Sequence, residues 1–475
     1  MDSDRRWVVA DLLLCAVLSG CVTMAPVDRP SAHDDWWVDA YATEAGEGSR
    51  ERPWKVAPSR VPPATWVHLA SGLYRGPFEL APGARLIGEG TAVVFLEGAG
   101  TVVVAQDARL EHLSIQGGSL GLEVRGRVEA AEVHFSGHRG SAARVGPGAL
   151  AAFTGLTVEG STGQDGLLVV GGGMELGRSR FIGALQRAVK VERGWARLTA
   201  VSSEGAASLV HGVESGLVIE ASSAAGGRGP GLFAAGGSLK VRGLSVVGQE
   251  YGIEASGAVI DLDSVSTTGS QLSGVALERC TGRVGRLQVD HAGPLGGVQL
   301  LGSVVTLEDV HVSDSAAMGL LIRLGTVSLL RAQIDRVRSE GTAGGEPLLG
   351  DGLQVRDATL KIGSLKVSDV EGSGLYVSAA ASVVAELVEV DRSGAGAVVV
   401  ERGSQVRVAR LVSRAARGPA LLVTDGGQAR VVELEASGAE LPIWAECAEG
   451  ARVQLGALKW AGERPASRCV ERLEP

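Results

Sequence analysis

Apolar residues recur along the chain in a short, fixed pattern. A small residue, Gly or Ala, is followed by apolar residues one and three places later, with a variable residue between them. Alternation with a period of two indicates a β-strand that has one buried and one exposed face. The units begin at Gly121, Gly166, Ala188, Gly252, Gly274, Gly297, Gly319, Gly352, Gly374, Ala397 and Ala420.

A second pattern follows about ten residues after each start: apolar, two variable, apolar, one variable, apolar. From Gly252 onward the units are spaced by 22, 23, 22, 33, 22, 23 and 23 residues. A propeller blade needs ~40–50 residues, and a leucine-rich repeat would carry an Asn-containing pattern, whereas this chain has no Asn. We therefore predict an all-β, single-stranded parallel β-helix. Each coil of ~22 residues pairs with the coils above and below it, ~4.8 Å away.

Two local features refine this prediction. The glycine before each first strand suits a tight corner with positive φ. The step from Gly319 to Gly352 is about 11 residues longer than the others, and the excess falls around residues 338–351, which predicts a loop. Binding residues concentrate on such loops, although a tolerated insertion remains the alternative. The candidates at this loop are Asp335, Arg336, Arg338, Glu340 and Asp351.

The N-terminus carries an export signal. Arg5 and Arg6 precede an apolar stretch that ends in Leu-Ser-Gly-Cys, with the cysteine at Cys21. This sequence resembles the lipobox of bacterial lipoproteins, which implies a signal peptide over 1–20 and a lipid on Cys21. The apolar stretch is too short to span a ~30 Å hydrocarbon core. We expect a polar tether over 21–35 and a lipid-anchored location in the cell envelope. Val22 favours the outer membrane, and an ordinary cleaved signal peptide remains the alternative.

The rest of the chain divides into a cap over 36–66, the β-helix over 67–441, and a last coil with a C-terminal cap over 442–475. About fifteen coils would give a rod on the order of 70 Å long. Cys447 and Cys469 are 22 residues apart, one coil, so we predict a disulfide between them in an oxidising compartment. Cys280 then has no partner and is expected to lie buried in the wall.

The first coils resemble a known family. Residues 68–80 contain a Gly-Leu-Tyr turn and an apolar strand, and residues 82–90 lead through Leu86 to a Gly88-x-Gly90 corner. This order is similar to the opening turns of pectate-lyase-like right-handed parallel β-helix proteins, and with the repeats it covers roughly 66–458. The resemblance implies a right-handed helix. It also implies the chemistry of polysaccharide lyases, hydrolases or epimerases, with acids, often Ca²⁺, and an Arg or Lys base on one strand face.

Acidic residues follow the second strand of successive coils. These are Asp290, Asp314, Asp335, Asp369 and Asp391. Stacked coils would bring such carboxylates near one another, which a Ca²⁺ site requires. Asp335, Asp369 and Asp391 are therefore the catalytic candidates, and Asp314, Asp335 and Asp369 are the metal candidates. Alternatively, Asp opens turns through its local hydrogen bonds.

Composition narrows the function classes. The 45 basic and 54 acidic residues give a formal charge of −9, which disfavours nucleic acid as a partner. Aromatic residues make up only 4% of the chain, so platforms for sugar rings are few. The favoured hypothesis is a membrane-anchored, non-enzymatic scaffold or binding rod that needs no cofactor and contacts a polysaccharide or an envelope protein. An anchored polysaccharide lyase, hydrolase or epimerase, with or without Ca²⁺, is the alternative.

Overall fold

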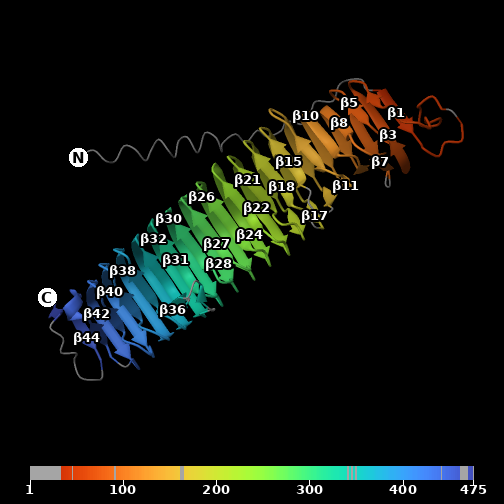
Figure 1. The fold of residues 1–475 in the computed structure, drawn as a ribbon. Helices are drawn as coiled ribbons and strands as arrows, with labels where there is room; N and C mark the ends of the chain where they lie inside the picture. Colours follow the sequence, from red (N-terminus) through yellow and green to blue (C-terminus); the bar gives the residue numbers. More distant parts are fainter. Residues whose placement is uncertain are drawn as a thin grey trace, which may run out of the picture.

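A computed structural model describes residues 34–473 except 45, 90–91, 161–164, 184, 340–341, 344–345, 348–349, 440 and 461–468. The described chain is a parallel β-solenoid of about 17 turns. Its strands stack along one axis from β1 at one end to β44 near the other (Figure 1). The predicted all-β parallel β-helix is therefore confirmed, with about two coils more than the spacing of the repeats suggested.

Each coil contributes to three faces. In one coil these are β18 (Arg187–Glu192), β19 (Trp195–Thr199) and β20 (Ser202–Glu204), which we call the first, second and third face. Every strand pairs in parallel with its equivalent in the coils before and after it, so β18 lies between β15 (Asp165–Val170) and β21 (Val210–Val213). The chain therefore winds with one coil per repeat.

In later coils the second and third faces share one long, bent strand. In β26 (Val259–Thr268) the alternation of buried and exposed residues breaks at Asp263 and Ser264, both of them half-buried, and then resumes. The bend falls at the two adjacent variable residues of the second sequence pattern. Strands of this kind are β22 (Gly216–Ala225), β24 (Ser238–Val247), β26, β28 (Thr281–Asp290), β30 (Val304–Ser313), β32 (Thr326–Val337), β36 (Thr359–Val370), β38 (Ser382–Ser393), β40 (Gln405–Arg414) and β42 (Gln428–Ser437).

The first face of these coils is built from short strands. They are β23 (Pro230–Ala235), β25 (Tyr251–Ser256), β27 (Ser273–Glu278), β29 (Gly296–Leu301), β31 (Met318–Arg323), β35 (Asp351–Arg356), β37 (Leu375–Ser378), β39 (Val398–Val400), β41 (Leu421–Val423) and β43 (Ile443–Ala445). Inward residues of all three faces, mostly Val, Leu, Ile and Ala, form one continuous core. Full burial of such a Val, Leu or Ile side chain contributes roughly 1.5–3 kcal/mol.

The glycines that open the first-face strands do not have the predicted positive φ. Gly252, Gly274, Gly319 and Gly352 are absent from the left-handed positions of the backbone. A Cβ atom on Gly319 would instead lie 2.4 Å from Cγ2 of Ile334 on the third face and 2.6 Å from the carbonyl oxygen of Gly352. Glycine is needed because the first face passes directly against β-branched side chains inside the coil. The sequence therefore identified the correct residues, but the predicted reason, a positive φ, was wrong.

Left-handed backbone occurs elsewhere, at the corner that follows the third face. His291, Asp314, Arg336, Asp369 and Arg392 occupy this position in successive coils, with φ between 53° and 57°. A left-handed conformation at a residue other than glycine costs about 1–2 kcal/mol. The five side chains form an outward column, which we call the corner column.

The two ends of the rod differ from the prediction in one respect. β1 (Asp34–Val38) pairs in parallel with β3 (Thr65–Leu69), so the segment 36–66 contributes the first coil and is not only a cap. Trp54 from this segment packs against Trp36, with ring centroids 5.0 Å apart. At the other end β44 (Arg452–Lys459) pairs with β45 (Val470–Arg472).

The cysteines lie where the coil length predicts them. Cys447 and Cys469 form a disulfide, with Cα atoms 5.4 Å apart. Cys280 is free and buried, and its thiol donates hydrogen bonds to the carbonyls of Ala255 and Glu278, each 3.4 Å away. Cys21, the signal peptide and most of the tether lie outside the described residues. Within the described ranges no helix has the length and apolar character needed to cross a membrane.

The 33-residue step contains the predicted loop. Between β32 and β35 the chain leaves the solenoid and forms β33 (Thr342–Ala343) and β34 (Glu346–Pro347), which pair antiparallel with each other. Neither strand pairs with a coil. β33 and β34 therefore lie outside the stacked coils, and the coils on either side stay in register, with β31 paired to β35.

Candidate functional site

The predicted aspartates form two columns. Asp290, Asp335 and Asp391 lie within two residues of the ends of the third-face strands and share one column, in which Ser313 and Ser368 occupy the intervening coils. Asp314 and Asp369 lie one residue later, in the corner column. The one-residue offset seen in the sequence therefore places the five acids on two adjacent lines.

Both acids of the corner column are paired with an arginine one coil later. The Arg336 guanidinium donates to both carboxylate oxygens of Asp314, at 2.8 and 2.6 Å. Arg392 donates to both oxygens of Asp369 in the same way, at 2.6 and 2.8 Å. These hydrogen bonds hold the pKa of Asp314 and of Asp369 below the usual value, so both groups are ionised near neutral pH.

The acids of the other column are also engaged. Asp335 is buried and accepts hydrogen bonds from the Ser368 hydroxyl and, at 2.7 Å, from the Gln333 side-chain amide. Asp391 pairs with Arg392. Each predicted catalytic aspartate is thus already engaged by a hydrogen-bond or ion-pair partner, whereas a catalytic acid–base pair needs groups that converge on a reacting atom.

The predicted Ca²⁺ ligands do not converge. Asp314 and Asp369 belong to coils on either side of Arg336, and Arg336 occupies both oxygens of Asp314. The described residues instead bring Asp290, His291 and Asp314 together, with one possible ligand atom from each within 4.8 Å of the others. Three ligand atoms fall well short of the six to eight oxygens that Ca²⁺ takes. The set predicted from the sequence is therefore not assembled by the described part of the chain.

An open hollow lies along this corner, next to the insertion. Its volume is about 640 Å³, and it begins at Ser339, where the chain leaves the solenoid. We call it the corner hollow. Of the predicted residues it contains Asp369, and the exposed Arg338 directly precedes Ser339; Glu340 lies outside the described residues. The lining residues are Ser339, Asp369, Val370, Glu371, Arg392, Ser393, Gly394, Ala415 and Arg417.

Small residues create this hollow. Glu371, Gly394 and Arg417 occupy the same position in successive coils, since each donates its N–H to the equivalent carbonyl of the preceding coil, that of Val337, Val370 or Ser393. The middle residue has no side chain, and a Cβ atom there would lie 2.1 Å from the carbonyl oxygen of Glu371. Close stacking of the coils therefore requires glycine and leaves a gap between an acid and a base.

The two charges that flank the gap are held apart. The Glu371 carboxylate accepts hydrogen bonds from the backbone N–H of Ser339, at 2.8 Å, and from its hydroxyl, at 2.7 Å. The backbone hydrogen bond is the main cause that lowers the pKa of Glu371. Arg417 is exposed, and the described part of the chain places no carboxylate in a salt bridge with it. An anion and a cation thus lie on either side of the gap left by Gly394.

A second polar group lies on the first face, and of its members the sequence predicted only Asp351 as a site residue. Asp351 is 1% exposed and accepts hydrogen bonds from the Ser373 N–H, at 2.7 Å, and the Gln354 amide, at 3.2 Å. Burial raises its pKa to about 6. Asp351 was predicted at the edge of the loop, and the structure places it at the start of β35, inside the packed surface.

The neighbouring coils extend this group. The Tyr376 hydroxyl donates to Glu401, and burial together with this carboxylate raises the pKa of Tyr376 to about 12. The Arg356 guanidinium lies 5.8 Å from the centroid of the Tyr376 ring. We call Asp351, Gln354, Arg356, Tyr376 and Glu401 the first-face cluster. In the sequence, this cluster is marked by polar residues at outward positions of adjacent repeats, such as Gln354 and Tyr376, which are paired in register.

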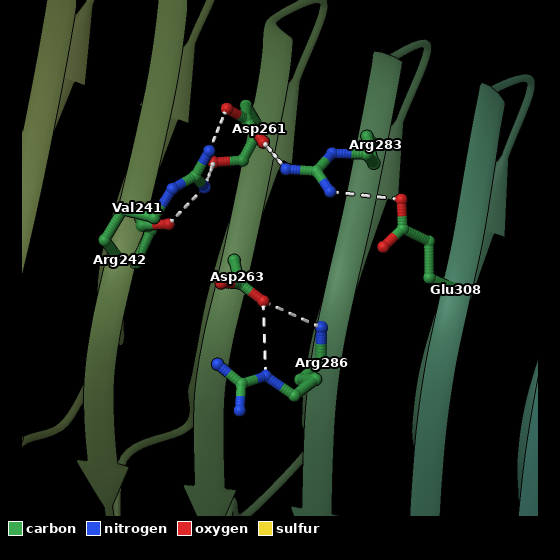
Figure 2. Close-up of polar contacts among 7 residues, drawn as sticks. All are labelled: Val241, Arg242, Asp261, Asp263, Arg283, Arg286 and Glu308. Atoms are coloured by element: carbon green, nitrogen blue, oxygen red, sulfur yellow. Dashed lines mark hydrogen bonds and ion pairs between the residues drawn. The ribbon is translucent and has the colours of Figure 1, made fainter.

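A third set of charges lies on the second face (Figure 2). Asp261 sits between Arg242 and Arg283, and Arg283 reaches on to Glu308, with both of its contacts at 3.1 Å. Although burial acts to raise the pKa of Asp261, hydrogen bonds from the two arginines hold it below the usual value. Exposed ion pairs of this kind contribute ~0–1 kcal/mol each. They connect four successive coils, and each of the four side chains has a partner of opposite charge.

The chain matches no protein-family model and no curated protein. It is similar to three solved structures of β-helix proteins, at low levels. A double mutant of the periplasmic alginate epimerase AlgG is 10% identical, with 90% of this chain and 84% of that chain covered and a TM-score of 0.26. The A-module of the Azotobacter vinelandii mannuronan C-5 epimerase AlgE4 is 11% identical, with 80% and 89% covered and a TM-score of 0.18.

A rhamnogalacturonan lyase is also 11% identical, with 69% of this chain and 82% of that chain covered and a TM-score of 0.18. All three TM-scores lie below 0.5, so the parallel β-solenoid of this chain rests on its own strand pairing and not on these neighbours. Similarity at this level says nothing about what this chain binds or converts.

Proposed function

We propose that this protein is a lipid-anchored rod of the cell envelope that binds partners on its surface and does not turn over a substrate. One observation supports the proposal above all others. Asp314 and Asp369 are each held as carboxylates by an arginine of the next coil, while Asp335 and Asp391 are satisfied by Ser368 and Arg392. A general acid near neutral pH needs a raised pKa, and arginine pairing has the opposite effect.

The anchor in this proposal is the lipid on Cys21. Two or more acyl chains give stable membrane attachment, which a single chain does not. Metabolic labelling with a radioactive fatty acid should mark the full chain, and Cys21→Ser should abolish the label and move the protein from the outer-membrane fraction to the soluble fraction. Labelling that persists in Cys21→Ser would contradict the anchor.

The absence of turnover can be tested directly. The purified protein, incubated with a panel of acidic polysaccharides with and without Ca²⁺, should yield no shortened chains, no unsaturated ends and no epimerised residues by mass spectrometry and NMR. Formation of any such product by the purified, folded protein would overturn the proposal.

The alternative function, a polysaccharide lyase, hydrolase or epimerase, has one observation in its favour. The first-face cluster combines a carboxyl whose pKa is raised to about 6 with an arginine and a tyrosine. Raised carboxyl pKa values are typical of catalytic acids. If the panel reveals turnover, Asp351→Asn and Tyr376→Phe should abolish it, whereas Asp335→Ala, Asp369→Ala and Asp391→Ala should not. The reverse result would restore the aspartate columns as the catalytic candidates.

A further inference from the structure

We infer that the corner hollow binds a short zwitterionic peptide, with Glu371 contacting its ammonium group and Arg417 contacting its carboxylate. This inference rests on the proposed function, because it assigns a ligand class to a surface that binds and does not catalyse. It starts from the pairing of charges along the rod. Several arginines in the described ranges are paired with an acid of a neighbouring coil, as Arg336 is with Asp314 and Arg392 with Asp369.

The column that carries Glu371 and Arg417 has no such pair. Two coil steps separate these residues, so their Cα atoms are about 10 Å apart. Gly394 fills the step between them and contributes no side chain. The two side chains are long enough to meet across this distance, yet no salt bridge joins them. The position of the Glu371 carboxylate explains why.

Ser339 draws the Glu371 carboxylate away from the gap. Arg338, the residue before Ser339, is one coil below Glu371, since Arg338 and Glu371 donate to carbonyls of successive coils, those of Ser315 and Val337. The two hydrogen bonds from Ser339 therefore pull the carboxylate toward the insertion, on the side opposite Arg417. Both hydrogen bonds end on Oε2, which leaves Oε1 available to a ligand.

The walls of the hollow match a dipolar ligand. Arg392 is committed to Asp369 and Asp391, so it closes one side without offering a free charge. Arg417 offers a planar guanidinium, which binds carboxylates in a bidentate manner. A dipeptide places its ammonium and its carboxylate on opposite ends of a single peptide unit, which suits a gap flanked by one acid and one base. A volume of about 640 Å³ is ample for a molecule of this size.

The test uses the full-length protein and alanyl-alanine as the probe, with binding followed by ligand-observed NMR and calorimetry. Alanyl-alanine should bind, and both N-acetyl-alanyl-alanine and alanyl-alanine amide should bind at least ten-fold more weakly, because each lacks one of the two charges. Binding should weaken as salt is added, since the contacts are exposed. No detectable binding of alanyl-alanine, or equal binding of either blocked peptide, would overturn the inference.

Variants locate the site. Arg417→Gln and Glu371→Gln should each weaken binding at least ten-fold, while Arg407→Gln, an exposed arginine on the second face outside the hollow, should leave it unchanged. Thermal unfolding of each variant checks that the rod remains folded. If the Arg407 variant weakens binding as much as the Arg417 variant, binding is non-specific and the inference fails. Failure here leaves the turnover assay unaffected, so the proposed function is judged separately.

Discussion

Asp351 is the residue for which the structure makes the clearest prediction about pH. Its pKa is raised from 3.8 to about 6 by burial, so the folded state favours the protonated form. The stability associated with this proton is complete below pH ~4 and is lost as the pH rises toward 6. At 1.36 kcal/mol per pKa unit the loss is at most roughly 3 kcal/mol.

Asp351→Asn should therefore raise the free energy of unfolding at pH 7.5 by up to roughly 3 kcal/mol and change it little at pH 4. Urea unfolding across this pH range measures the difference, and Glu386→Gln, at an exposed acid of the next coil, serves as the matched control. An Asp351→Asn variant whose stability follows the same pH curve as the parent protein would contradict the burial of an ionisable group at this position.

Gly319 provides a second test at this scale. Gly319→Ala would place Cβ 2.4 Å from Ile334, so the coil must shift, and we expect a loss of about 1–3 kcal/mol. Gly146→Ala is the control, because the nearest atom to its Cβ would be 3.9 Å away. Chemical unfolding should separate the two variants. Equal stability would mean that the close contact between faces is not what selects glycine.

The sequence predicted which residues point inward but not why glycine precedes them. Alternation reveals that Leu320 and Ile322 are buried, since burial and period are linked. The contact between Gly319 and Ile334 joins residues on different faces of one coil, and no local pattern reports the distance between two faces. The left-handed backbone conformation at Arg336 and Arg392 could not be predicted from the sequence either, because arginine does not favour it.

At the level of elements, the disulfide should stabilise the last coils. Its loop spans 22 residues, for which chain-entropy arguments give on the order of 3 kcal/mol. Cys469→Ser should accelerate amide hydrogen exchange in β44 and β45 and leave the central coils unchanged. Cys280→Ser is the control, since Ser303 occupies the same place one coil later and makes the same kind of hydrogen bond to a carbonyl. Unchanged exchange in β44 after loss of the disulfide would contradict this prediction.

Elements were predicted well where the repeat is uniform. The loop before β35 and the disulfide between Cys447 and Cys469 were both predicted by comparison with the 22-residue period. The bend inside the long strands was not predicted, although two adjacent variable residues mark it. The sites were predicted less well, because they depend on which neighbouring side chain each charged group contacts. The sequence shows Asp369 near a turn, but only the register places Arg392 one coil above it, where it captures both carboxylate oxygens.

The whole molecule should behave as a rod in solution. About 17 turns at ~4.8 Å give a length of roughly 80 Å before side chains are counted. A compact globular domain with the same number of residues would have a diameter of roughly 60 Å. Small-angle X-ray scattering of the monomer should give an asymmetric pair-distance distribution that extends beyond 80 Å. A symmetric distribution that ends near 60 Å would exclude the rod.

The ion pairs of Figure 2 have a consequence for how such a rod can change its length. In backbone shape the coils are nearly interchangeable, so loss of residues 252–273 would bring Gly274 into the place of Gly252 and shorten the rod by one step of ~4.8 Å. The charges are not interchangeable. Lys240, now opposite Asp261, would then face Arg283, and an attraction between coils would become a repulsion. The charges thus distinguish one coil from another. They restrict which coils can be lost or duplicated without placing like charges opposite each other on neighbouring coils.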